Sequence, residues 1–256
     1  MFTINKVSKC FLCYTTPLKR KKMFSTVFKK PKILALDKDL TIAPVSSYSY
    51  AKSIYYIPLL SSEISKASCS YPILFAKVEE EIFPIALLSL TENKNSFVDR
   101  RGKWEEGFYI PAFLKTYPFA ITPVKWNEPS RVIYDASYKG IKKENGIEII
   151  KDRKITEKGE KILENIKKHY LKFQETVKDF QKLDEMGLFK EADVILATEE
   201  KGQSRVLTNI YQIDVDKLDK LTDSEILFLV KTGIMAAIYF HLASFGNIEK
   251  LKSRLK

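Results

Sequence analysis

The segment FVDRRGKWEEGFYIPAFLKTYPF, residues 97–119, concentrates acidic and aromatic side chains that could form a ligand site. The carboxylate of Asp99 and the rings of Trp104, Tyr109 and Tyr117 could line an amphipathic pocket with hydrogen-bonding groups on its wall. The same aromatic side chains could instead plug the end of a sheet, because large aromatic residues bury well. Composition favours the second interpretation, in which the segment ties a strand to a following short helix or turn.

A histidine, His241, lies near the end of an apolar stretch at 226–245. A histidine in such a place can donate a hydrogen bond to a backbone carbonyl, and this structural role is favoured here. As a base or ligand contact it would act with Asp99 and Tyr109, which is the enzymatic alternative. Carboxylates near predicted turns add further candidates. The full set of candidate pocket or binding residues is Glu63, Asp99, Trp104, Tyr109, Tyr117, Asp135 and His241.

The common catalytic and cofactor motifs are missing from the sequence, which has no GxGxxG, Walker A, HExxH or GxSxG pattern. A CxxC is present at Cys10 and Cys13, but Cys69 is the only other cysteine, and a structural zinc site normally needs a second pair. We therefore expect no metal and no cofactor, and the sequence does not assign a reaction.

The net charge of +11 is concentrated at the N-terminus. Residues 1–33 contain nine Lys or Arg and no Asp or Glu, so the remainder carries 34 basic against 32 acidic residues. The whole chain has only seven Arg, the residue that forms bidentate hydrogen bonds with bases and phosphates. Nucleic-acid binding is therefore not expected.

The basic stretch 1–33 is predicted to be a leader that is disordered, or the product of a misassigned start with the natural start at Met23. Its apolar patch precedes the basic cluster, which is the wrong order for a signal peptide. Residues 34–256 are predicted to fold as a single domain. Three cysteines suit a reducing compartment, and a cytoplasmic location is expected.

Hydrophobic periodicity predicts an α+β fold. Two apolar runs at 72–79 and 82–90 read as a hairpin, and 204–213 reads as a further strand. The stretch 61–68 predicts a short helix capped by Ser61 or Ser62. From about residue 156 an apolar stripe predicts an amphipathic helix of about 30 residues. The stripe consists of Ile162, Ile166, Tyr170, Phe173, Val177 and Phe180.

The stretch 226–245 follows a capping box, TDSE, at residues 222–225 and predicts an apolar helix. Its length is close to that of a membrane span, which makes a membrane-associated component an alternative function. Lys231 and His241 within it, together with Gly233, favour a buried helix and no integral membrane span. The expected fold is thus a mixed or mostly antiparallel sheet packed against the long amphipathic helix and a buried C-terminal helix.

Three stretches, at 57–75, 86–119 and 232–251, together resemble the SapC family of bacterial proteins. The order of motifs is similar: a Tyr-Pro strand, an Asn-x-Phe-Val-Asp turn before Gly-x-Trp, a segment ending in Tyr-Pro-Phe, and a C-terminal His-Leu-x-Ser. Lys115 departs from the arginine often found there, and 151–154 lacks an expected glycine. The matching positions are Glu63, Tyr71, Pro72, Asn95, Phe97, Asp99, Gly102, Trp104, Tyr109, Pro111, Tyr117, Pro118, Phe119, Asp135, His241 and Ser244.

The resemblance implies an association with bacterial surface layers and no defined enzymatic activity. The chain does not resemble the peptide-transporter permease or the saposin that carry a similar name. We therefore expect a soluble binding or accessory factor for surface-layer protein or peptide maturation, with a protein or peptide partner. A small-molecule ligand is a further option. The two alternatives are an enzyme built around Asp99, Tyr109 and His241, and a membrane-associated component that uses 226–245.

Overall fold

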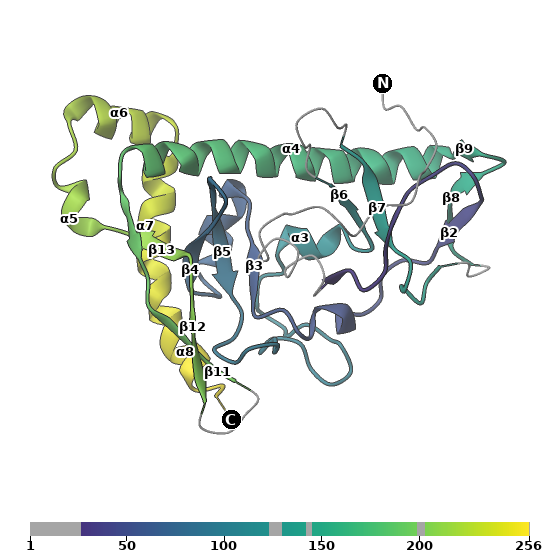
Figure 1. The fold of residues 1–256 in the computed structure, drawn as a ribbon, viewed down its shortest axis with the longest axis horizontal. Helices are drawn as coiled ribbons and strands as arrows, with labels where there is room; N and C mark the ends of the chain where they lie inside the picture. The colour runs from purple at the N-terminus through teal and green to yellow at the C-terminus, as the bar shows by residue number, and fades with distance from the viewer. Residues whose placement is uncertain (1–26, 123–129, 142–144, 199–202, 256) are drawn as a thin grey trace. The chain divides into compact units, whose positions relative to one another are not determined.

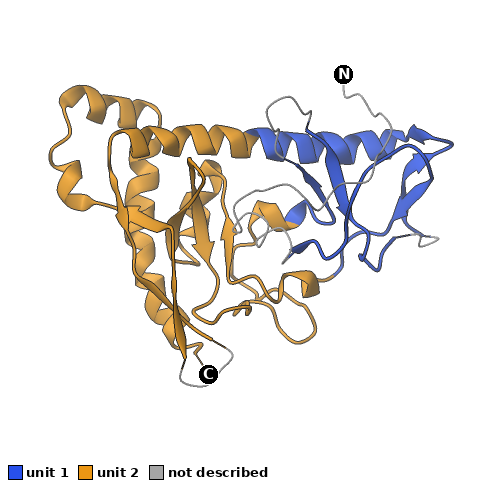
Figure 2. Cartoon of the chain, viewed as in Figure 1, with its two compact units in different colours: residues 1–46, 115–171 blue, residues 47–114, 172–256 orange. Residues whose placement is uncertain are grey.

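The structure is a computed structural model that describes residues 27–122, 130–141, 145–198 and 203–255. Helices and antiparallel sheets both contribute, so the predicted α+β class is confirmed (Figure 1). The chain divides into two compact units, residues 1–46 with 115–171 and residues 47–114 with 172–256 (Figure 2). Helix α4 (Glu157–Glu185) contributes to both. Folding of 34–256 as a single domain stays a prediction.

Among its described residues, the first unit contains two three-stranded antiparallel sheets, β1-β7-β6 and β2-β8-β9. The apolar stripe on the first half of α4 covers a core that both sheets supply, with Ile166 buried and Ile162 and Tyr170 packed beside it. This is what the 3.6-residue spacing of the stripe predicts. The strands are β1 (Pro31–Ile33), β2 (Leu40–Ile42), β6 (Phe119–Ile121), β7 (Val132–Asp135), β8 (Ile147–Lys151) and β9 (Lys154–Ile155).

The folded chain reaches into the predicted leader. Val27 and Phe28 are buried, and β1 pairs with β7 from Pro31↔Asp135 to Ile33↔Ile133. Residues 27–33 of the predicted leader are therefore part of the described fold. The proposed start at Met23 and the CxxC pair lie outside the described residues.

The second unit contains, in its described part, a five-stranded antiparallel sheet of order β10-β13-β4-β5-β3 and the two-stranded ribbon β11-β12. The predicted hairpin is confirmed by β4 and β5, paired from Ile73↔Ala86 to Val78↔Glu81. The predicted strand at 204–213 divides into β12 and β13, which belong to different sheets, with Asn209 between them at a φ of 60°. The strands are β3 (Tyr56–Pro58), β4 (Ile73–Val78), β5 (Glu81–Leu87), β10 (Phe189–Glu191), β11 (Val194–Ala197), β12 (Ser204–Leu207) and β13 (Ile210–Ile213).

The second half of α4 packs on this sheet. The ring of Phe180 lies 5.1 Å from that of Phe75 on β4, and the ring of Phe173 lies 5.3 Å from that of Phe83 on β5. Packing of the long amphipathic helix against a sheet is therefore confirmed. The remaining elements are η1 (Ser49–Ala51), η2 (Ser61–Glu63), α2 (Ile64–Ala67), α3 (Ala112–Lys115), α5 (Val215–Leu218), η3 (Phe245–Asn247) and α8 (Ile248–Lys252).

The apolar C-terminal stretch forms two helices rather than the single one predicted at 226–245. Helix α6 (Asp223–Lys231) starts at the predicted capping box, and α7 (Ile234–Ser244) follows Gly233, whose φ is 76°. Helix α7 buries one face against the sheet, whereas much of the apolar surface of α6 is exposed. Within the described chain no single helix has the length and hydropathy to cross a membrane; α6 and the stretch 234–252 satisfy both only as a pair bent by 85°.

Candidate functional site

Asp99 opens a tight turn in the 97–119 segment. Its Oδ1 accepts a hydrogen bond from the Lys103 amide at 2.8 Å, and Val98 and Trp104 form an antiparallel bridge across the turn. The hydrogen bond from the Lys103 amide lowers the pKa of the Asp99 carboxyl. Asp99 is exposed, and its contacts explain the turn without a ligand.

Two glycines of this segment have nearly the same left-handed backbone but different surroundings. Gly102 has a φ of 84°, and a Cβ there would lie 2.1 Å from the hydroxyls of Ser47 and Ser49; Gly107 has a φ of 83° with open space. We expect Gly107→Ala to lower the free energy of unfolding by about 1 kcal/mol through backbone strain. Gly102→Ala should lower the free energy of unfolding by about 3 kcal/mol, because its Cβ would also collide with the two serine hydroxyls. Denaturant titration of both variants checks this, and equal losses would mean that the turn adapts.

The aromatic side chains around this turn pack on one another. The ring of Phe97 lies 4.8 Å from those of Tyr71 and Phe108, and it stacks on Trp104 at 6.5 Å. Phe97 and Trp104 are buried. We call these rings the aromatic plug, because they pack on one another and fill the space between backbone segments.

Glu63 and Tyr109, two of the candidate residues, are in direct contact. Glu63 is 4% exposed, and its Oε1 accepts hydrogen bonds from the Tyr109 hydroxyl at 2.8 Å and the Ala112 amide at 2.7 Å. Its Oε2 accepts from the Leu60 amide at 3.0 Å. The cap of η2 is thus Leu60, held by Glu63, rather than the predicted Ser61 or Ser62. The carboxylate joins the start of this helical segment to the start of α3.

The main chain of Tyr109 is fixed as firmly as its hydroxyl. Its amide donates to Ser70 Oγ at 3.1 Å, and its carbonyl accepts from the hydroxyl of the buried Tyr71. Burial, together with the neighbouring Glu63 carboxylate, raises the pKa of the Tyr109 hydroxyl above its ordinary value. Tyr109 is therefore held as a protonated hydrogen-bond donor, which suits a structural tie better than a catalytic base.

Asp135 and Tyr117 form a second contact pair, within the first unit. Asp135 is buried, and its Oδ2 accepts from the Tyr117 hydroxyl at 3.0 Å. Its carboxylate also accepts from the amides of Lys29 and Lys30 and from the amide and hydroxyl of Ser137. Burial alone would raise the pKa of Asp135, but these hydrogen bonds outweigh it and lower the pKa. The carboxylate anchors the chain that leads into β1.

His241 fills a gap in the five-stranded sheet. Strand β13 pairs with β4 through Ile210↔Ala76 and Tyr211↔Phe75, and the same register extended would set Ile213 opposite Ile73. At that point the imidazole bridges the strands: Nδ1 lies 2.7 Å from the Ile73 carbonyl, and Nε2 accepts from the Ile213 amide at 3.2 Å. The proton must therefore sit on Nδ1.

Ser244, one turn further along α7, completes this connection. Its hydroxyl accepts from the Ile73 amide at 2.8 Å and donates to the His241 carbonyl. Both polar backbone groups of Ile73 are thus bonded to side chains of α7. His241 is 0% exposed and uses both ring nitrogens on backbone, so its geometry is that of a structural histidine.

The seven candidate residues thus lie in different surroundings. The structure joins Glu63 to Tyr109 and Tyr117 to Asp135, and it places Trp104 in the aromatic plug. Asp99, Tyr109 and His241, which the enzymatic alternative groups together, each contact different residues. In the described ranges no group of three or more His, Cys, Asp or Glu side chains is placed to hold a metal ion.

Exposed apolar side chains on α6 and α7 form a feature that the candidate list did not include. On α6, Leu227 is 52% and Val230 is 57% exposed, and on α7, Tyr239 is 62% exposed. Ile226 and Phe240, which are adjacent to Leu227 and Tyr239 in the sequence, are also exposed. We call Ile226, Leu227, Val230, Tyr239 and Phe240 the apolar faces of α6 and α7. In the sequence these residues belong to a continuous apolar stretch. A fully buried helix would show the same pattern, so the sequence does not reveal that they are exposed.

The fold and these contacts define an α+β protein whose central polar residues tie its own elements together. The SapC family model matches residues 37–251, which is most of the chain, and the protein belongs to the SapC family. No curated protein and no solved structure matches the chain.

Proposed function

We propose that this SapC family member is a binding or accessory factor that holds a protein or peptide partner on the apolar faces of α6 and α7. The observation that carries the proposal is the exposure of these large apolar side chains, two of them aromatic. Large apolar side chains that are left exposed on two consecutive helices are candidates for an interaction surface. The carboxylate, tyrosine and histidine candidates, by contrast, are occupied by internal hydrogen bonds.

The partner class that we propose is a bacterial surface-layer protein or a peptide in maturation, as the family resemblance implies, and the proposed location is the cytoplasm. The arrangement of Asp99, Tyr109 and His241 gives the enzymatic alternative no further support. A catalytic role would require these three side chains to converge on one position where a substrate atom could react.

Removal of the apolar faces tests the proposal. The double variant Leu227→Ser/Val230→Ser should recover at least tenfold less of the partner that co-purifies with the wild-type chain from its native host, because truncating central apolar contacts is costly in interfaces. The matched control is Ile195→Ser/Val206→Ser on the β11-β12 ribbon, where the two side chains are 61% and 52% exposed and lie opposite each other.

The control variant should recover the partner as the wild type does. Equal recovery by the two double variants, with both folded by circular dichroism, would refute the assignment of the partner surface to α6. A wild-type chain that purifies with no specific partner would refute the binding function itself.

A further inference from the structure

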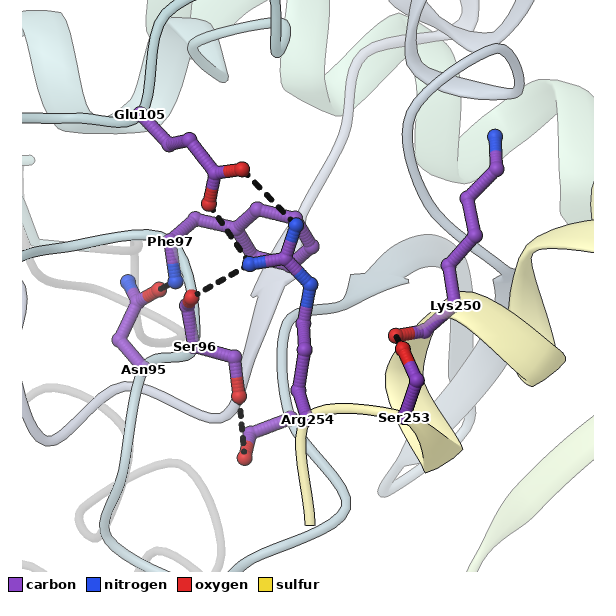
Figure 3. A network of polar contacts seen from close by, with 8 residues as sticks. Asn95, Ser96, Phe97, Glu105, Lys250, Ser253 and Arg254 are labelled. Atoms are coloured by element: carbon purple, nitrogen blue, oxygen red, sulfur yellow. Dashed lines mark hydrogen bonds and ion pairs between the residues drawn. The ribbon is translucent and has the colours of Figure 1, made fainter. Parts of the chain in front are cut away.

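The side chain of Arg254 contacts the segment 96–108 through hydrogen bonds, an ion pair and aromatic rings (Figure 3). Its Nη1 donates to Glu105 Oε2 at 2.6 Å and to the Ser96 carbonyl at 3.0 Å, and its Nη2 donates to Glu105 Oε1 at 2.9 Å. The guanidinium carbon lies 4.4 Å from the centre of the Phe97 ring and 5.1 Å from that of Phe108. A carboxylate fork, a carbonyl and two aromatic faces are groups that recognise arginine.

The residues that bind Arg254 are held in place by contacts that do not involve it. The Phe97 amide donates to Asn95 Oδ1 at 2.9 Å, and Asn95 is itself bonded to the Ala51 carbonyl at 3.1 Å. The Glu105 amide donates to the Phe97 carbonyl at 2.8 Å. The site is therefore expected to keep its shape when the arginine leaves, and a preformed site binds with a smaller loss of conformational entropy.

The arginine is presented in a way that allows exchange. Arg254 follows the end of α8, and the side chains of Arg254 and Glu105 are 25% and 41% exposed. Because both side chains keep contact with water, release of Arg254 does not leave a fully buried carboxylate unpaired. A second arginine at high local concentration could displace it.

We propose that Ser96, Phe97, Glu105 and Phe108 form an arginine-recognition site, which Arg254 occupies in cis and which an arginine of a partner peptide occupies in trans. The cis occupant shows which ligand chemistry fits: a planar guanidinium that bonds in a fork and lies against aromatic rings. A lysine would keep the charge and lose the fork. The inference goes beyond the proposed function, because it concerns a different surface and stands whether or not α6 and α7 bind a partner.

The variant Arg254→Ala tests the site by emptying it. Isothermal titration uses the acetylated tetrapeptide Ser-Arg-Leu-Lys, the chain's own residues 253–256, and the same peptide with lysine in place of arginine. Arg254→Ala should bind the arginine peptide at least tenfold more tightly than the wild type does, and at least tenfold more tightly than it binds the lysine peptide. Glu105→Gln in the Arg254→Ala background should remove this preference for arginine.

Three results would overturn the proposal: no binding by Arg254→Ala, equal affinity for the two peptides, or equal affinity of the wild type and the variant. Free L-arginine is the control for ligand source, and binding as tight as that of the peptide would contradict a peptide ligand. If Arg254→Ala does not fold by circular dichroism, Arg254→Lys replaces it, because it retains the charge and gives up the fork. The same expectations then apply.

Discussion

Replacement of His241 by alanine should lower the free energy of unfolding by about 4 kcal/mol, because the Ile73 carbonyl and the Ile213 amide would lose their partners inside the sheet. The ring also packs against Phe75 and Phe245, at 5.0 and 4.8 Å, and these contacts would be lost. Urea titration at neutral pH measures the effect. His241→Gln, which retains an acceptor and a donor, should lose less than His241→Ala. A loss below about 1 kcal/mol for the alanine variant would show that water or a local shift replaces the imidazole.

The pH dependence of stability gives an independent measure of the same histidine. Burial lowers the pKa of His241 to about 4 from its ordinary value of 6.5, although the hydrogen bond to the Ile73 carbonyl acts in the opposite direction. Between these values the unfolded chain binds a proton that the folded chain does not. The stability contributed by the neutral ring is therefore complete above pH 6.5 and falls by about 3 kcal/mol as the pH drops to 4. His241→Gln should lack this part of the loss, and an identical pH profile for variant and wild type would contradict the buried neutral ring.

Replacement of Glu63 by alanine should cost about 3 kcal/mol, because three donors, the Leu60 and Ala112 amides and the Tyr109 hydroxyl, would lose their acceptor. Glu63→Gln keeps the shape but turns an N–H group towards donors, so a loss of about 2 kcal/mol is expected. Denaturant titration of both variants checks the ranking. If Glu63→Ala were as stable as the wild type, this carboxylate would not hold the start of α3.

Tyr109→Phe separates the hydroxyl contact from the rest of the Glu63 network. We expect a loss of about 1 kcal/mol for this variant alone, and a coupling energy of similar size with Glu63→Gln in a double-mutant cycle. Tyr239→Phe is the matched control, since Tyr239 is exposed and should change stability by less than about 0.5 kcal/mol. Additive losses for Glu63 and Tyr109 would mean that their contact contributes nothing.

Elements set by local patterns could be predicted from the sequence. The hairpin of β4 and β5, the stripe of α4 and the capping box at Thr222 all depend on residues close together in the chain. The break at Gly233 and the division of 204–213 could not be predicted, because the hydrophobic pattern is continuous across both. Tertiary packing decides where each helix or strand ends. Hydrophobicity also could not tell the exposed face of α6 from the buried face of α7.

The site residues were predicted as members of a set, and their pairing was not. Glu63 contacts Tyr109 across 46 positions of the chain. Arg254 and Glu105, which were not among the predicted residues, are in contact across 149 positions. No spacing rule connects residues so far apart, since their contact depends on how sheets and helices pack. Composition favours a plug formed by Trp104, Tyr109 and Tyr117, because large rings tend to be buried. In the structure Trp104 is buried and stacks on Phe97, which that prediction did not include.

Hydrogen–deuterium exchange of the chain with its co-purified partner tests the central claim most directly. If the apolar faces of α6 and α7 hold the partner, the amides of residues 223–244 should exchange more slowly in the complex, and those of the control ribbon, β11 (Val194–Ala197) and β12 (Ser204–Leu207), should exchange as in the free chain. Unchanged exchange of residues 223–244 in the complex, with protection found only elsewhere in the chain, would contradict the account.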